Sequence, residues 1–217
     1  MPLYSRHGET ASIMALAPVI PVLTVDSVED GLNQAKALVA GGLYAIEVTL
    51  RTPSALAAIA AISKAVPGAV AGAGTIVSAE QIDEALAAGA RFLVSPGATP
   101  ALAKAAAQSP VPFLPGCATA SEAMALRELG FRALKLFPAE AVGGARLLAS
   151  LAAPLPDLSF CPTGGIDQAK APDYLKLPNV ACVGGSWMLP KASLKRGDYA
   201  VVETLSREAA GLARAPG

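Results

Sequence analysis

Short apolar or β-branched runs alternate along the chain with longer alanine-rich stretches, and polar or glycine-containing turns separate the two. The short runs have the length of strands, and the alanine-rich stretches are typical of helices. Strands joined through single helices run parallel, so the repeated unit predicts an α/β protein with a closed (β/α)₈ TIM barrel. Eight strands are expected, over residues 18–25, 44–50, 69–75, 92–96, 112–118, 133–138, 158–163 and 180–185.

Turn residues refine this prediction. An open doubly wound sheet usually carries a glycine-rich turn after its first strand, whereas this chain has Thr24-Val-Asp-Ser27 there, which favours the barrel. Thr52 ahead of Pro53 predicts a helix start, and Ser78-Ala-Glu-Gln81 predicts a capping box. Glycines mark three expected helix ends, at Gly41, Gly89 and Gly130.

Length and composition fit one such domain. The chain has 217 residues, 53% of them hydrophobic and 16% charged, so it can bury a large core. We expect a single barrel domain over residues 1–217, in which residues 1–11 form a short N-terminal extension. The early apolar run at residues 13–23 is too short to span a membrane and contains Pro18 and Pro21.

Charge and cysteine content favour a small-molecule partner and a reducing compartment. Lys plus Arg and Asp plus Glu both number 17, so no net charge attracts nucleic acid or an anionic membrane. The three cysteines, Cys117, Cys161 and Cys182, form no CxxC pair and fall in expected strands, which predicts neither a disulfide framework nor a zinc site. We expect a cytoplasmic protein.

One lysine interrupts an apolar strand. In Ala133-Leu-Lys-Leu-Phe-Pro138, alternate side chains point to opposite faces, so Leu134 and Leu136 face the helices. Lys135 then faces the barrel interior together with Phe137. Most lysines reach solvent, and the other seven of this chain do fall in expected helices or loops. Burial of Lys135 disfavours its ammonium form and leaves more free amine to attack a carbonyl.

The expected second strand carries a carboxylate in the same way. Tyr44-Ala-Ile-Glu-Val-Thr-Leu-Arg51 alternates strictly, which places Glu47, Thr49 and Arg51 on the interior side. A purely structural Glu–Arg pair is the simpler interpretation, but a buried ion pair adds little stability. The second and sixth strands lie opposite each other in an eight-stranded barrel. Glu47 and Lys135 can therefore act on one substrate as general base and amine nucleophile.

Paired glycines follow the expected seventh and eighth strands, in Cys161-Pro-Thr-Gly-Gly-Ile166 and Val183-Gly-Gly-Ser-Trp187. In (β/α)₈ enzymes the loops at this place often bind phosphate through backbone N–H groups. Gly72 and Gly74, beside Thr75, could hold a carboxylate or carbonyl oxygen of a ligand, or allow close helix packing. The candidate phosphate ligands are Gly164, Gly165, Gly184, Gly185 and the hydroxyl of Ser186.

Six segments share a pattern with a known enzyme family. They are Glu47-Val-Thr-Leu-Arg51, Gly72-Ala-Gly-Thr75, Ser95-Pro-Gly97, Leu134-Lys-Leu-Phe-Pro-Ala-Glu140, Cys161-Pro-Thr-Gly-Gly165 and Gly184-Gly-Ser-Trp187. Together they resemble the class I 2-keto-3-deoxy-6-phosphogluconate (KDPG) aldolases of the Entner–Doudoroff pathway. The resemblance extends over about residues 12–210. It implies cleavage of KDPG to pyruvate and glyceraldehyde 3-phosphate, with 4-hydroxy-2-oxoglutarate (KHG) as a second candidate substrate.

The resemblance also implies a homotrimer that needs no metal or other cofactor. It assigns Lys135 as the Schiff-base lysine and Glu47 as the carboxylate that transfers protons. Arg51 and Thr75 correspond to the groups that hold the pyruvate carboxylate. The candidate pocket residues are Pro96, Phe137 and Thr163, and the two glycine pairs with Ser186 correspond to the phosphate site. Cys117 stands where family members often have another small residue.

Three alternative functions stay open. A metal-dependent aldolase or epimerase would need clustered histidine and carboxylate ligands, and the only histidine is His7 in the expected extension. A non-catalytic sugar-phosphate binding barrel could keep the glycine loops but has no need for an interior amine and carboxylate. An aldolase for the galactonate epimer would differ only in its preference at C4.

Overall fold

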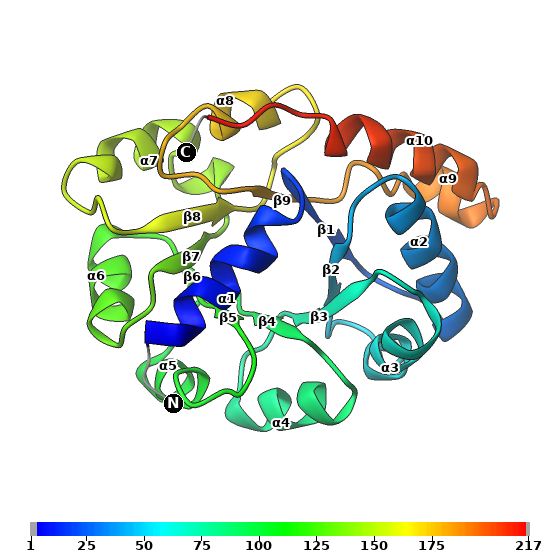
Figure 1. The fold of residues 1–217 in the computed structure, drawn as a ribbon, viewed down its shortest axis with the longest axis horizontal. Coiled ribbons are helices and arrows are strands. Elements are labelled where there is room, and N and C mark those ends of the chain that lie inside the picture. Colours follow the sequence, from blue (N-terminus) through cyan, green and yellow to red (C-terminus); the bar gives the residue numbers. More distant parts are fainter. Residues whose placement is uncertain (1–3, 216–217) are drawn as a thin grey trace.

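The structure, a computed structural model, describes residues 4–215, with side chains from residue 10 onward. Its centre is a curled parallel sheet with helices around the outside (Figure 1). The strands are β1 (Val19–Leu23), β2 (Ala45–Thr49), β3 (Val70–Gly74), β4 (Phe92–Val94), β5 (Phe113–Leu114), β6 (Gly116–Cys117), β7 (Ala133–Leu136), β8 (Ser159–Pro162) and β9 (Val183–Gly185).

The helices follow the strands in alternation. They are α1 (Tyr4–Ala15), α2 (Val28–Ala40), α3 (Ala55–Ala65), α4 (Ala79–Ala87), α5 (Pro100–Ala106), α6 (Ala120–Glu128), the 3₁₀ helix η1 (Glu140–Val142), α7 (Gly144–Ala152), α8 (Ala171–Leu175), α9 (Lys191–Lys195) and α10 (Tyr199–Ala210). None of the helices within the described residues is long and apolar enough to cross a membrane.

Every expected strand region contains a strand, so the predicted order of strands is confirmed. The strands pair as a six-stranded sheet, β5-β4-β3-β2-β1-β9, and a three-stranded sheet, β6-β7-β8. The expected strand at 112–118 forms two short strands, because Pro115 between them has no N–H for the ladder. Two isolated parallel bridges, Phe160 with Val180 and Thr163 with Gly184, connect the chain at β8 to the chain at β9.

Strand alternation divides the core as predicted. Leu134 and Leu136 of β7 and Ile46 and Val48 of β2 belong to the large apolar cluster that also contains residues of the surrounding helices. A second, smaller cluster lies inside the curled sheet and combines side chains from six strands with Met14 of α1. The other interior-facing residues of β2 and β7 are polar, namely Glu47, Thr49 and Lys135.

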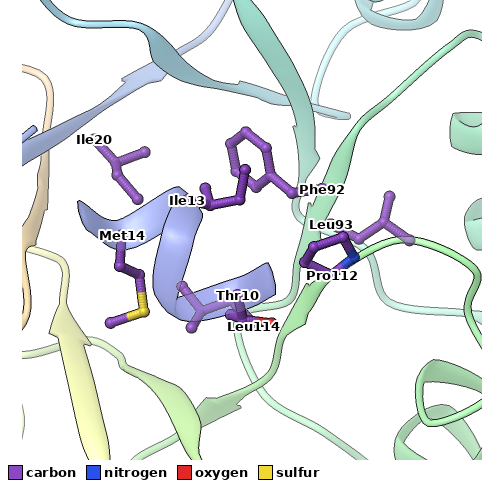
Figure 2. A pocket seen from close by; sticks show the side chains of 8 residues that line it. All are labelled: Thr10, Ile13, Met14, Ile20, Phe92, Leu93, Pro112 and Leu114. Carbon is purple, nitrogen blue, oxygen red and sulfur yellow. The ribbon is translucent and has the colours of Figure 1, made fainter. Parts of the chain in front are cut away.

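Helix α1 covers the end of the sheet at which the strands begin. It crosses in front of the strands in Figure 1, and Met14 packs with Ala45, Phe92 and Ala133, the first residues of β2, β4 and β7. Figure 2 shows the small pocket at this end, lined mainly by apolar side chains of α1 and the strands around it. The helix continues across the expected boundary between residues 11 and 12. The side chain of His7, the only histidine of the chain, lies outside the described part.

The predicted helix boundaries are mostly confirmed. α4 begins after Ser78, whose hydroxyl accepts from the N–H of Gln81, although the Gln81 side chain accepts from Val77 and not from Ser78. The start predicted at Thr52 is wrong. α3 begins at Ala55, and the Thr52 hydroxyl donates to the carbonyl of Val25 (2.7 Å), which ties the loop after β2 to the loop after β1.

Glycine does end the three helices where it was expected. Gly41 is the C-cap of α2, while Gly89 and Gly130 each lie one residue beyond the caps of α4 and α6. Gly89 and Gly130 have φ values of 86° and 95°, a left-handed conformation that glycine adopts without steric cost. After α2 the left-handed residue is Gly42, with φ 92°.

Candidate active site

Lys135 of β7 and Glu47 of β2 meet inside the curled sheet. The Lys135 Nζ lies 3.1 Å from Oε1 and 3.4 Å from Oε2 of Glu47. Their side chains are only 6% and 3% exposed. Burial of either charge alone would be costly, so each group makes the burial of the other tolerable. The structure therefore brings together the two side chains that the sequence placed on opposite strands.

A glycine makes room for the carboxylate. Gly74 pairs with Thr49 across β2 and β3 and has the Glu47 side chain directly above its Cα. A Cβ at residue 74 would lie 2.7 Å from the Glu47 carboxyl carbon and closer still to Oε1. The neighbouring Gly72 gives the same space to the ring of Phe92. The glycines of β3 therefore accommodate side chains of this protein, and not helix packing as the simpler interpretation held.

Arg51 and Thr75 form a second polar pair where β2 and β3 end. The Arg51 Nε donates to the Thr75 hydroxyl (3.1 Å), and Arg51 is exposed. Thr75 has φ 61°, which is a strained conformation for a β-branched residue. Arg51 does not pair with Glu47, so the structural Glu–Arg pair considered from the sequence is wrong: Glu47 pairs with Lys135. Arg51 thus keeps most of its donors free for a ligand.

Phe137 and Pro96 border the lysine. The Lys135 Nζ lies 5.4 Å from the centroid of the Phe137 ring, within the range of a cation–π interaction. Gly116 pairs with Lys135 in the register of β6 and β7, and a Cβ at residue 116 would overlap the backbone of Pro96. Pro96 therefore lies against the strand next to the lysine, on the side of β4.

The two glycine loops lie side by side where β8 and β9 end. Thr163 bridges to Gly184, and a Cβ at residue 184 would lie 3.0 Å from the Thr163 Cγ2. Gly164 has φ 105° and Gly165 has φ 78°, so both need a conformation that favours glycine. Gly164 also approaches Phe137: a Cβ there would lie 3.4 Å from the ring. Thr163 and Phe137 thus connect the lysine to the first glycine loop.

The second glycine loop has an aromatic cover that sequence reasoning missed. The ring of Trp187 packs over Gly185, where any Cβ would collide with it, and Ser186 is exposed beside it. Trp187 ends one of the six segments that resemble the family, but the sequence indicated no role for it. The sequence also indicated no role for Glu140, which lies against Gly165. The contact of Glu140 has no local sequence signal, since it depends on how two separate segments meet, whereas Trp187 lies only two residues after Gly185.

Cys117 faces away from this site. It is buried in the outer apolar cluster, between the sheet and the helices. Burial, with a smaller contribution from the charge of Glu122, raises the pKa of the Cys117 thiol to about 12. The thiolate, which is the reactive form, is therefore scarce at neutral pH. Within residues 4–215, no three His, Cys, Asp or Glu side chains gather in a group that could hold a metal ion.

The site residues lie within or just after the strands, at the end of the sheet opposite α1. This end carries the chemistry in α/β barrels. A curled parallel sheet with a buried strand lysine paired to a carboxylate, next to glycine loops, is typical of α/β enzymes that use a lysine nucleophile. The family model described as KDPG and KHG aldolase matches residues 10–205. The chain belongs to this family.

Known relatives agree in sequence and in structure. The KHG/KDPG aldolase of Escherichia coli is 48% identical over 198 residues, which cover 91% of this chain and 93% of the relative. The KDPG aldolase of Legionella pneumophila, with pyruvate captured as a covalent carbinolamine intermediate, is 41% identical, with a TM-score of 0.91 over 93% of this chain and 98% of that one. The Zymomonas mobilis KDPG aldolase with 3-phosphoglycerate is 46% identical, with a TM-score of 0.92 over 96% and 98%.

Gly74→Ala should displace the Glu47 carboxylate from Lys135, because the added methyl would occupy its place. We expect a loss of unfolding free energy of about 1–3 kcal/mol, measured by urea denaturation. A crystal structure of the variant should show the Lys135–Glu47 contact lengthened or broken. Gly211→Ala is the matched control, since a Cβ there meets its nearest neighbour at 3.5 Å. An unchanged Lys135–Glu47 contact in the variant would contradict this account.

Proposed function

We propose that this chain is a class I aldolase that cleaves KDPG to pyruvate and glyceraldehyde 3-phosphate through a Schiff base on Lys135. The observation that carries the proposal is the buried contact between Lys135 and Glu47, 3.1 Å long, in a member of the KDPG and KHG aldolase family. The covalent pyruvate carbinolamine of the Legionella relative supports the same chemistry.

Lys135 is the nucleophile. Proton transfer to Glu47 gives the free amine, which adds to the C2 carbonyl carbon and forms a carbinolamine. Glu47 returns the proton to the carbinolamine hydroxyl, which leaves as water, and the product is an iminium. The short distance between Nζ and Oε1 allows both transfers without a change of partner.

Glu47 then acts as the base for cleavage. Its carboxylate, through a water molecule, removes the proton of the C4 hydroxyl. The C3–C4 bond breaks and its electrons move to the iminium. Glyceraldehyde 3-phosphate is released, and an enamine stays bound to Lys135. Glu47 helps to protonate C3 of the enamine, and hydrolysis releases pyruvate and the free lysine. The iminium is the electron sink, so we propose that no metal or other cofactor takes part.

The remaining site residues hold the substrate. Arg51 and Thr75 bind the carboxylate next to the reacting carbonyl, since a guanidinium and a hydroxyl are suited to a carboxylate. Pro96, Phe137 and Thr163 form the walls of the pocket around C2 to C4. The phosphate binds at the Gly164–Gly165 and Gly184–Gly185 loops and the Ser186 hydroxyl, where backbone N–H groups can approach an anion.

We further propose that residues 1–217 act as one catalytic domain and that the sheet closes into a (β/α)₈ barrel. Two observations support closure. Isolated bridges connect the chain at β8 to the chain at β9, and β6 follows β5 directly. The protein is proposed to work in the cytoplasm, in the Entner–Doudoroff pathway, as a homotrimer. KHG is the proposed second substrate, in keeping with the two names that the family carries.

Pyruvate with sodium borohydride should add three carbons to Lys135, because reduction traps the Schiff base. Peptide mass spectrometry locates the adduct, and the same treatment should abolish aldolase activity. Lys135→Met should form no adduct, whereas Lys104→Met, a change at an exposed helix residue, should react as the native protein does. Tight pyruvate binding without any adduct would instead favour the non-catalytic binding barrel.

Glu47→Gln should lower kcat for KDPG cleavage by about 10²–10⁴-fold, the usual contribution of a general base. Borohydride trapping on Lys135 should persist, since the amide still leaves the amine in the pocket. Single-turnover assays with KDPG and the trapping assay with pyruvate separate the two effects. Normal turnover in this variant would remove Glu47 from the mechanism.

KDPG should be cleaved with a higher kcat/KM than its galactonate epimer, since two of the relatives are KDPG aldolases by name. Pyruvate release from both epimers, coupled to lactate dehydrogenase and measured side by side, tests this preference. Faster cleavage of the galactonate epimer would reassign the substrate and leave the Lys135 chemistry intact.

A further inference from the structure

Three side chains hold the Gly164–Gly165 loop from behind. Glu140 of η1 accepts a hydrogen bond from the Tyr174 hydroxyl at Oε1 and forms an ion pair with Lys170 at Oε2 (2.8 Å). The Lys170 Nζ also donates to the carbonyl oxygen of Gly165 (3.0 Å). We call Glu140, Lys170 and Tyr174 the loop network. None of its members contacts Lys135 or Glu47 in the described hydrogen bonds and ion pairs.

The loop network completes a set of bonds to three successive carbonyls. The N–H of Ala139 donates to the Thr163 carbonyl (2.8 Å), and that of Glu140 donates to the Gly164 carbonyl (3.1 Å). Lys170 takes the third carbonyl, that of Gly165. All three carbonyls therefore point toward η1 and α8.

This orientation determines where the loop N–H groups point. In a trans peptide the C=O of one residue and the N–H of the next point in opposite directions. The N–H groups of Gly164, Gly165 and Ile166 thus face away from η1 and α8, and no acceptor within residues 4–215 takes a hydrogen bond from them. Three unpaired donors on one side of a turn suit a phosphate.

Packing adds to the bonds. A Cβ at Gly165 would lie 2.8 Å from Cγ and 2.9 Å from Cβ of Glu140, so the glycine rests on the aliphatic part of that side chain. Tyr174 is 1% exposed, and its hydroxyl fills the space beside Gly144. The hydrogen bonds from Lys170, and then from Tyr174, hold the pKa of the Glu140 carboxyl below its usual value. Glu140 is therefore charged at neutral pH.

A carboxylate beside a phosphate site would by itself repel the ligand. Here the Lys170 ammonium compensates the charge, and the carboxylate orients that ammonium toward the Gly165 carbonyl. We propose that Glu140, supported by Tyr174, is a positioning residue that sets the first glycine loop for phosphate and so makes the enzyme selective for phosphorylated aldehydes. This inference rests on the proposed function.

The test compares two variants with a matched control. Glu140→Gln removes the charge that holds Lys170, and Tyr174→Phe removes only the hydroxyl while it keeps the buried ring. Asp173→Asn is the control, since it removes a carboxylate from an exposed ion pair with Lys176 on the same helix, α8. Because Tyr174→Phe changes no charge and little packing, it keeps the test decisive if Glu140→Gln fails to fold.

Two assays measure the condensation of pyruvate, one with glyceraldehyde 3-phosphate and the other with glyceraldehyde, which lacks the phosphate. Glu140→Gln and Tyr174→Phe should raise the KM for the phosphorylated aldehyde, and the inhibition constant of inorganic phosphate, by about three- to tenfold, the loss expected for one typical hydrogen bond. The kinetics with glyceraldehyde and the borohydride adduct of pyruvate should stay as in the native protein. Asp173→Asn should change none of these values.

Three results would overturn the positioning role. A lower KM for glyceraldehyde 3-phosphate in Glu140→Gln would mean that the carboxylate only repels phosphate. Equal losses with both aldehydes would mean a general effect on the fold. Unchanged phosphate selectivity in both variants would mean that the Gly164–Gly165 loop keeps its conformation without these two side chains. Failure of the native protein to trap pyruvate is a separate result, and it would contradict the proposed function instead.

Discussion

The site depends on one buried ion pair, between Lys135 and Glu47. A lone ammonium or a lone carboxylate at this depth would carry a desolvation cost of several kcal/mol, of order 3–5 kcal/mol when one partner of such a pair is removed. The two charges come from strands in different sheets and meet at 3.1 Å. Their neighbours are shaped around them, since Gly74 leaves room for the carboxylate and Phe137 places its ring beside the ammonium.

The two ends of the sheet differ in packing and polarity. At one end α1 places Met14 among the first residues of the strands and seals an apolar interior. At the other end the strands lead into Thr75, with its strained backbone, and into the two glycine loops. A packed end and a polar, strained end suit an enzyme, because the first holds the strands in register while the second presents their reactive groups.

The first glycine loop shows how contacts from neighbouring segments hold a backbone in one conformation. Gly164 and Gly165 adopt left-handed conformations, and their carbonyls accept hydrogen bonds from the Glu140 N–H and the Lys170 ammonium. A glycine pair alone would be free to turn its peptides either way. The contacts behind the loop remove that freedom, so the conformation of the loop depends on side chains that lie outside it.

The strand order, the faces of the strands on which Lys135 and Glu47 lie, and the glycine loops follow from the sequence alone, because strand alternation and turn chemistry are local. It could not show that Glu47 pairs with Lys135 and not with Arg51, nor that α3 begins at Ala55. These points, and the contacts of Gly74 and Glu140, became visible only in the folded chain. Each depends on residues far apart in the sequence that meet in three dimensions, for which no local pattern exists.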